Sequence, residues 1–225
     1  MTDQLALINE HARCPKCDGT GGFFLRDGTA LECSHCLTTF DFEAEILDFV
    51  AGRQRTTLDD LDYDEMYDVD ARLLDQFRSL EARAAPLFER RFESVLEIGA
   101  GTGGLTVGML EGANIGTAIV TDISPKMLER CRDKVRAFEI ETPVLYATNN
   151  GEDLNVKDES FDLVVAYFCV HHILDYQNFL ASCYRALRPG GQAVFVEPGL
   201  RFLYALFTCM TPAIGRLARN AQNWL

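Results

Sequence analysis

A short apolar run that passes directly into a glycine-rich turn constrains the fold of this chain more than any other segment. Residues 95–98 read VLEI, and residues 99–104, which follow, read GAGTGG. Glycines at this spacing allow a tight turn after a buried strand and a close approach of the backbone to a bound nucleotide. The segment therefore predicts a strand, turn and helix of an α/β nucleotide-binding fold.

The chain beyond this turn alternates apolar runs with helical patterns. The runs are rich in Val, Leu and Ile, which is typical of parallel strands buried on both faces, and Ser124 with Pro125 is an N-cap followed by a proline at the first helical position. We expect strands at 95–98, 117–121, 143–147, 161–167 and 193–196, and helices at 105–110, 125–138 and 176–187. The predicted fold class is α/β, with a doubly wound, mostly parallel sheet.

Two acidic residues distinguish between the ligands that such a turn can hold. Glu97 lies two residues before the first glycine, where it would repel the pyrophosphate of a dinucleotide. S-adenosylmethionine has no phosphate and carries a sulfonium and an ammonium, which a carboxylate attracts. Asp122, at the end of the second of these strands, is suited to bind ribose hydroxyls, as an acid about twenty residues beyond the glycines does in related folds. The pattern favours S-adenosylmethionine.

Five segments, taken in order, resemble the class I S-adenosylmethionine-dependent methyltransferases. They cover residues 95–103, 121–128, 152–154, 160–165 and 187–191. Their spacing is similar to that of the methyltransferase type 11 group, which includes ubiquinone-biosynthesis-like enzymes. The resemblance implies a Rossmann-like domain with S-adenosylmethionine as its cofactor.

The resemblance also implies roles for individual positions. Glu97 would bind the methionine amino group, Asp122 the ribose, and Ile123 would lie against the adenine. Asn150 stands where the family usually has an aspartate, and its amide oxygen can accept a hydrogen bond from the adenine amino group. The implied cofactor-binding residues are Glu97, Gly99, Ala100, Gly101, Gly103, Asp122, Ile123, Met127, Asn150, Gly151 and Glu152.

Three residues at or after the end of the fourth strand of this set are the candidate catalytic residues. Tyr167 falls where such enzymes join the cofactor and substrate pockets. His171 or His172 could take a proton from the attacking atom, because the unperturbed pKa of histidine lies near neutrality. Many members of the family carry a similar pair that does not act as a base, and alignment alone accelerates the displacement. A mechanism without a base stays open.

Four cysteines near the start of the chain form two C-x2-C pairs separated by fifteen residues. A hairpin between the pairs would complete a tetrahedral four-thiolate set. The predicted ligands of a structural Zn²⁺ are Cys14, Cys17, Cys33 and Cys36. An iron–sulfur cluster and His35 in place of one thiolate are the alternatives. The segment resembles the small zinc-ribbon activators of methyltransferases, which implies a zinc ribbon fused ahead of a catalytic domain.

The sequence divides into three expected units. Residues 1–50 form the zinc ribbon, 51–92 an acidic connector with an amphipathic helix, and 93–225 the methyltransferase domain. Beyond residue 200 the chain reads as an apolar helix broken by Pro212, where a complete class I sheet needs two more strands. We therefore expect the C-terminal strands of the sheet to be missing.

The net charge of −13 is concentrated in residues 1–90, which carry 19 Asp and Glu against 9 Lys and Arg. Because phosphate contacts dominate nucleic-acid affinity, this balance argues against autonomous RNA or DNA binding. No apolar stretch reaches the roughly twenty residues that cross a bilayer. Without a secretory leader, the eight cysteines are expected in a reducing compartment. We therefore expect a cytoplasmic protein.

The expected activity is methyl transfer from S-adenosylmethionine to an O, N or C nucleophile of a small or amphiphilic metabolite. Two alternatives stay open, namely methylation of a ribosomal or transfer-RNA base, and a non-catalytic binding partner with a degenerate methyltransferase fold. A protein partner, or self-association through the zinc ribbon or the C-terminal helix, is a further expectation.

Overall fold

One continuous sheet runs through the computed structural model, which describes residues 2–50 and 90–197. Within these residues its strand order is β1-β2-β3-β4-β7-β6-β5-β8-β9. The parallel part comprises β5 (Phe92–Ile98), β6 (Ile115–Asp122), β7 (Val144–Thr148), β8 (Phe161–Tyr167) and β9 (Leu187–Val196). Within this parallel part, β5 comes first in sequence and lies in the middle. β6 and β7 follow on one side of β5, and β8 and β9 on its other side. This confirms the predicted doubly wound α/β class.

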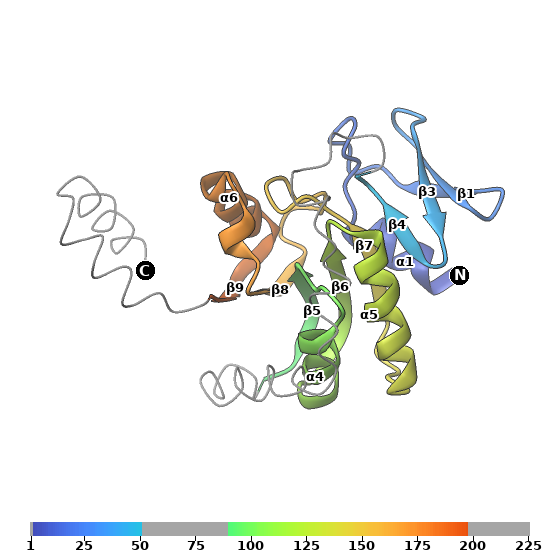
Figure 1. Cartoon of the computed structure of the whole chain (residues 1–225). Helices are drawn as coiled ribbons and strands as arrows, with labels where there is room; N and C mark the ends of the chain where they lie inside the picture. The colour runs from blue at the N-terminus through green and yellow to red at the C-terminus, as the bar shows by residue number, and fades with distance from the viewer. Residues whose placement is uncertain (1, 51–89, 198–225) are drawn as a thin grey trace.

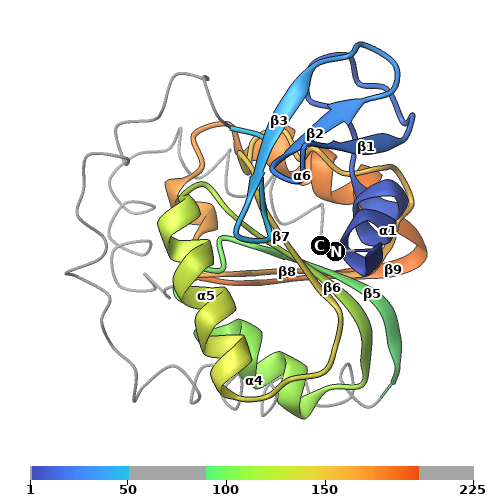
Figure 2. The ribbon, with the colours of Figure 1, turned by 90° about the vertical axis from the view of Figure 1, so that its right-hand side faces the viewer.

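Helices cover both faces of the parallel strands. They are α1 (Thr2–His11), α4 (Gly104–Gly112), α5 (Pro125–Ala137) and α6 (Tyr176–Ala186). Ala118 and Val120 of β6 belong to the core that α4 and α5 cover, whereas Ile119 between them belongs to the core of α1 and α6. Figure 2 shows α4 and α5 on one side of the sheet and α1 on the other. Because successive side chains of a strand point to opposite faces, β6 is buried on both.

Most of these helices and strands lie close to the positions that local sequence patterns predicted. The Ser124 hydroxyl accepts a hydrogen bond from the Met127 backbone N–H at 3.4 Å, so α5 begins at Pro125 as predicted. The largest difference is β9, which starts at Leu187 and not at residue 193. Leu187 pairs with Phe161 across a register shift in the ladder. The early part of the strand was not predicted because it contains a proline and two glycines at 189–191, and these residue types are rare in strands.

The N-terminal segment extends the parallel sheet at its β7 end (Figure 1). Its strands are β1 (Phe23–Arg26), β2 (Ala30–Cys33), β3 (Thr39–Glu43) and β4 (Ile46–Asp48). The first three pairings are antiparallel, but β4 pairs with β7 in parallel, with Leu47 opposite Ala147. Neither this pairing nor helix α1 was predicted.

The two parts of the described chain also share one apolar core. Phe23, Leu47 and Phe49 of the N-terminal segment belong to the same buried cluster as Ile119 and Leu145 of the parallel sheet. Polar contacts also cross this junction: for example, Gln4 Nε2 donates to Val144 O at 2.8 Å, Arg132 Nη1 to Ala44 O at 2.5 Å, and Arg136 Nη2 to Glu45 Oε2 at 2.8 Å.

Two predicted features lie outside the described residues. These are the acidic connector with its amphipathic helix, up to residue 89, and the apolar C-terminal helix beyond residue 200. Among the helices in the described ranges, none has the length and apolarity needed to cross a membrane.

Candidate cofactor site and four-cysteine cluster

The ends of the parallel strands bring the predicted cofactor residues to one edge of the sheet. Glu97 is the penultimate residue of β5, Asp122 is the last residue of β6, and Asn150 follows β7. In open α/β sheets, ligands bind outside the carboxyl ends of the strands, where the strand order reverses. In this sheet the reversal falls at β5, next to the glycine-rich turn.

Glycine is required in the turn at two positions for conformation and for space. Gly99 and Gly103 have φ values of 69° and 85°, in the left-handed region that favours glycine. A Cβ on Gly99 would lie 2.6 Å from the Cβ of Cys169, and one on Gly103 would lie 2.6 Å from the Sγ of Cys131. The neighbouring Ala100 is buried, and its N–H donates to Thr121 O at 3.0 Å. The turn is thus held against β6, α5 and the segment that follows β8.

The Asp122 carboxylate ties this turn to the start of α5. Its Oδ2 accepts from the Gly101 N–H at 2.8 Å, and its Oδ1 accepts from the Ser124 N–H at 2.9 Å. Burial raises its pKa, and these backbone donors oppose that shift. Each oxygen keeps a second acceptor site for a ligand hydroxyl. Ile123 is half-buried beside it, and Met127 is buried in the first turn of α5.

Glu97 is a buried carboxyl group with an unsatisfied oxygen. The residue is 2% exposed, and its Oε2 has no hydrogen-bond partner among the described residues. Burial raises the Glu97 pKa to about 7, and nearby Asp122 adds to the shift, while a hydrogen bond with Thr106 opposes it. A buried anion is costly unless it is paired. The arrangement therefore suits a ligand with a positive group, such as the ammonium of S-adenosylmethionine.

The loop after β7 holds the other predicted cofactor residues. The Asn150 Oδ1 accepts from the Glu152 N–H at 3.1 Å, so it already has one partner. Glu152 Oε1 accepts from the Asp175 N–H at 3.3 Å, which directs this carboxylate toward the start of α6. A Cβ on Gly151 would lie 2.8 Å from Ile173 Cδ1. The loops that follow β7 and β8 are therefore packed together.

Two aromatic rings lie where β8 ends. The Tyr167 ring stacks on the Phe168 ring with a centroid distance of 4.5 Å and an interplanar angle of 22°. Phe168 has a φ of 54°, which is strained for a bulky residue, and it is 45% exposed. Strain of this kind concentrates at functional sites. Sequence reasoning missed Phe168, because no local pattern reveals a left-handed phenylalanine.

The two histidines follow in the short helix η1 (Val170–His172). His171 Nδ1 lies 2.5 Å from Glu197 Oε2, and the ring centroids of His171 and His172 are 4.0 Å apart. Burial, and then the neighbouring His171, lower the pKa of His172. Sequence reasoning missed Glu197. An acid directly after a parallel strand, at the ligand-binding edge, is the signal that could have identified it.

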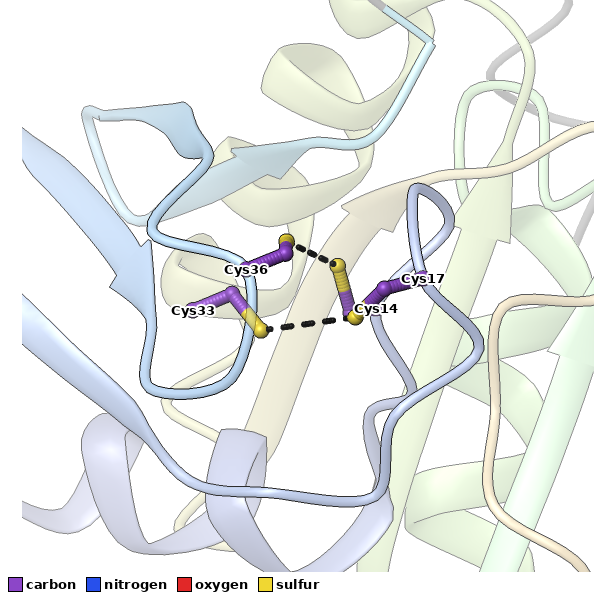
Figure 3. A group of neighbouring side chains, drawn as sticks. All are labelled: Cys14, Cys17, Cys33 and Cys36. Atoms are coloured by element: carbon purple, nitrogen blue, oxygen red, sulfur yellow. Dashed lines mark hydrogen bonds between the residues drawn. The ribbon is translucent and has the colours of Figure 1, made fainter.

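The four predicted metal ligands lie together, with all four sulfur atoms within 4.8 Å of one another (Figure 3). The Cys14–Cys36 and Cys17–Cys33 sulfur distances are 3.7 and 3.9 Å. Four sulfurs at about 2.3 Å from a tetrahedral Zn²⁺ would be roughly 3.8 Å apart. His35 is not a member of the group. The thiolate donors and their spacing therefore fit zinc.

The thiols of this cluster differ in acidity. Burial raises the pKa of Cys14 to about 12, whereas hydrogen bonds with Thr38, first with its hydroxyl, lower the pKa of Cys36 to about 6. A bound cation favours the thiolate form of every ligand.

Arg13, the residue before the first cysteine, connects this cluster with the loop after β7, which carries the predicted cofactor residue Asn150. Its Nη1 lies 3.4 Å from Asp18 Oδ1, and its Nη2 donates to Asp153 Oδ1 at 3.0 Å and to Leu154 O at 3.3 Å. Asp153 and Leu154 belong to the loop that carries Asn150. Sequence reasoning did not single out Arg13.

Comparison with known families identifies a methyltransferase domain. The family model described as "Methyltransferase domain" matches residues 96–195. A demethylmenaquinone methyltransferase of Tropheryma whipplei is 38% identical over 106 residues, which cover 47% of this chain and 41% of that protein. A ubiquinone/menaquinone biosynthesis C-methyltransferase of Vibrio cholerae is 33% identical over 137 residues, covering 57% and 52%. The chain spans about half the length of the curated relatives it matches.

Two solved structures show the same fold. A Methanococcus maripaludis protein assigned to the S-adenosylmethionine-dependent methyltransferases aligns with a TM-score of 0.53 and 17% identity, over 59% of this chain and 60% of that one. A Pyrococcus horikoshii protein aligns with a TM-score of 0.52 and 22% identity, over 64% and 61%. Together, the family match and the names of the relatives indicate a methyltransferase domain over residues 96–195.

Proposed function

We propose that this chain transfers a methyl group from S-adenosylmethionine to a small or amphiphilic acceptor. The observation that carries the proposal is the buried Glu97 carboxylate, whose Oε2 has no partner among the described residues and lies in the strand that leads into the glycine-rich turn. Glu97 would bind the methionine ammonium, Asp122 the ribose, and Ile123 with Met127 the adenine. The bound cofactor supplies an electrophilic methyl group on a sulfonium.

For the acceptor, we propose an aromatic ring that carries a hydroxyl group, of the quinol type. The relatives are named as methyltransferases of demethylmenaquinone and of ubiquinone and menaquinone biosynthesis. The stacked Tyr167 and Phe168 rings, of which Phe168 is 45% exposed, offer a flat apolar surface for such a ring at the cofactor edge.

Calorimetry and labelled methyl transfer test this proposal separately. The wild-type chain should bind S-adenosylmethionine and not a nicotinamide dinucleotide, and it should transfer labelled methyl to the reduced form of a short-chain 2-prenyl-1,4-naphthoquinone. Absence of cofactor binding would instead support the non-catalytic alternative. Binding accompanied by transfer only to transfer or ribosomal RNA would replace the quinol by a nucleic-acid acceptor.

The affinity for S-adenosylmethionine should fall as the pH drops through neutrality. The Glu97 pKa is raised to about 7 in the free protein, so below that pH the carboxyl is neutral and no longer attracts the ammonium. One linked proton predicts an increase in Kd of about tenfold per pH unit well below the pKa. Calorimetry across the neutral range measures it. Glu97→Gln should bind weakly and lose this Glu97-linked dependence, whereas Glu111→Gln, at an exposed position of α4, should keep the wild-type profile.

The isolated chain should show no affinity for transfer or ribosomal RNA at physiological ionic strength. Residues 1–90 carry 19 acidic and 9 basic residues, so the phosphate contacts that dominate RNA affinity are disfavoured. A gel-shift assay at micromolar protein measures this. Binding that disappears as salt is raised would contradict the expectation, because that is the signature of phosphate contacts.

We also propose that Cys14, Cys17, Cys33 and Cys36 hold one structural Zn²⁺. Four thiolates saturate the ion, so it would have no open position for catalysis. For the compartment we propose the cytoplasm, because a site of four cysteine ligands suits a compartment in which thiols are kept reduced. Cell fractionation of the tagged chain tests the second point, and recovery in a membrane or secreted fraction would contradict it.

A further inference from the structure

A single carboxylate holds both the backbone and the ring of the turn that carries the two histidines. Glu197 directly follows β9, and its Oε1 accepts from the Val170 N–H at 2.8 Å. Its Oε2 lies 2.5 Å from His171 Nδ1. β8 and β9 are adjacent parallel strands, and their last pair is Tyr167 with Val196, so the acid and the histidine meet at one edge of the sheet.

This contact determines which nitrogen of His171 is available. An ionised carboxylate only accepts hydrogen bonds, so the hydrogen lies on Nδ1 of His171. When the ring is neutral, Nε2 is therefore left with its lone pair. The pair is partly open to solvent, with side-chain exposures of 43% for His171 and 30% for Glu197. An ion pair of this exposure contributes little to stability. The bond from the Val170 N–H holds the carboxylate in place, and the contact with Nδ1 orients the ring.

The same turn is built directly on the glycine-rich loop. Cys169 Sγ donates to Ile98 O at 3.2 Å, and a Cβ on Gly99 would lie 2.6 Å from the Cβ of Cys169. The His172 N–H donates to Cys169 O at 3.0 Å. The His171–Glu197 pair thus lies on the element that packs against the first glycine of the proposed cofactor site.

We propose that His171 is the catalytic base for the methyl acceptor and that Glu197 is its positioning residue. This inference rests on the proposed methyl transfer and adds a requirement to it, namely that the acceptor has a weakly acidic hydroxyl proton to lose. His172, whose ring is 4.0 Å from that of His171, and Cys169, whose Sγ donates to Ile98 O, are titratable groups beside the pair. The role is assigned to His171 because Glu197 contacts its ring nitrogen.

The proposed step conserves atoms and charge. His171 Nε2 takes the proton of the acceptor hydroxyl, and Glu197 stabilises the resulting imidazolium. The electron pair released on the oxygen, or on the ring carbon conjugated with it, forms the bond to the methyl carbon. The electrons of the broken carbon–sulfur bond stay on sulfur. If carbon is the nucleophile, the ring proton leaves afterwards and the oxygen regains one, so the net release is one proton in either case.

Three variants test the assignment of the base. With a reduced short-chain 2-prenyl-1,4-naphthoquinone as the probe, His171→Gln should lower kcat by on the order of 10²–10³, as expected when a general base is lost. The KM for S-adenosylmethionine should stay within about twofold, since the cofactor contacts are unchanged. His172→Gln, the matched control, should change kcat by less than about threefold. Glu197→Gln should lower kcat by on the order of 10–100.

Two further readouts separate positioning from a structural role. Glu197→Asp should restore part of the kcat that Glu197→Gln loses, because the shorter carboxylate can still accept from His171 Nδ1. Nitrogen NMR of the cofactor-free wild-type chain should show His171 with its hydrogen on Nδ1, and Glu197→Gln should lose this preference. Circular dichroism establishes that each variant is folded.

The outcomes distinguish this inference from the proposed function. If the wild type does not bind S-adenosylmethionine in calorimetry, the proposed function fails. If it binds the cofactor and methylates no hydroxylated ring, or if His171→Gln and His172→Gln have equal effects, the assignment of His171 is overturned. A kcat of Glu197→Gln within about threefold of the wild-type value would remove Glu197 from its role and leave methyl transfer intact.

Discussion

A chain that carries Cys33→Ser should lose its metal and unfold at a temperature roughly 10 °C or more below that of the wild type. At this chain length, each ~1 kcal/mol lost from the free energy of unfolding lowers Tm by about 2–4 °C. A structural zinc site contributes on the order of 10 kcal/mol, which is comparable to the whole stability of a domain of about 5–15 kcal/mol. Cys33 is fully buried, in the same core cluster as Phe23 and Leu47 of the N-terminal segment and Ile119 of the parallel sheet. The loss should therefore reach the methyltransferase domain.

Metal analysis and thermal unfolding measure this effect. The wild type should contain one zinc per chain, and removal of the zinc with a chelator should lower its melting temperature as the substitution does. His35→Ala is the matched control, because His35 is exposed in the same turn and lies outside the sulfur cluster. Metal loss in His35→Ala would support the alternative in which His35 replaces one of the four thiolates as a ligand. An iron signal would support the cluster alternative, and absence of any metal in protein purified without chelator would contradict the site.

Replacement of Asp122 by alanine should weaken S-adenosylmethionine binding by on the order of 100-fold, or about 3 kcal/mol. The carboxylate would bind the ribose, and it also accepts from the Gly101 and Ser124 N–H groups at 2.8 and 2.9 Å. The substitution therefore removes a ligand contact and also releases the glycine-rich turn from α5. Asp122→Asn should not rescue the affinity fully, because its amide nitrogen faces one of the two backbone donors.

Calorimetry measures this loss, with circular dichroism and zinc content as checks on folding. Glu129→Ala removes the same charge from an exposed position of α5 and should leave the affinity unchanged. An affinity of Asp122→Ala within about threefold of the wild type, a difference below ~1 kcal/mol, would show that Asp122 does not hold the cofactor.

The buried parallel sheet could be predicted closely because its signals are local. The limits of β8 match the prediction, and α5 begins where Ser124 and Pro125 indicated. The four cysteines were identified as one group by their spacing, and the structure brings their sulfurs within 4.8 Å. The roles assigned to the cofactor residues stay predictions, although Glu97 and Asp122 do lie at one edge of the sheet.

Other features depend on contacts between distant segments. Helix α1 shows no strong amphipathic pattern in its sequence, and its place is determined by contacts such as Gln4 with Val144 O. Glu197 meets His171 only because β8 and β9 are neighbours with a shared register. The unsatisfied oxygen of Glu97 likewise depends on what surrounds it in the folded chain.

The sequence by itself determined the strand and helix order of the parallel domain, the glycine-rich turn and the grouping of the four cysteines, because each depends on residue types at short spacing. Only the tertiary structure decided that β4 of the cysteine segment joins β7 in parallel, about a hundred residues away in sequence and with Leu47 opposite Ala147. Pairing at a sheet edge uses backbone N–H and C=O groups, which nearly every residue has, so no side-chain pattern names the partner strand. For that reason the sequence could not predict that the cysteine segment and the parallel domain share one sheet and one core, and only the tertiary structure shows it.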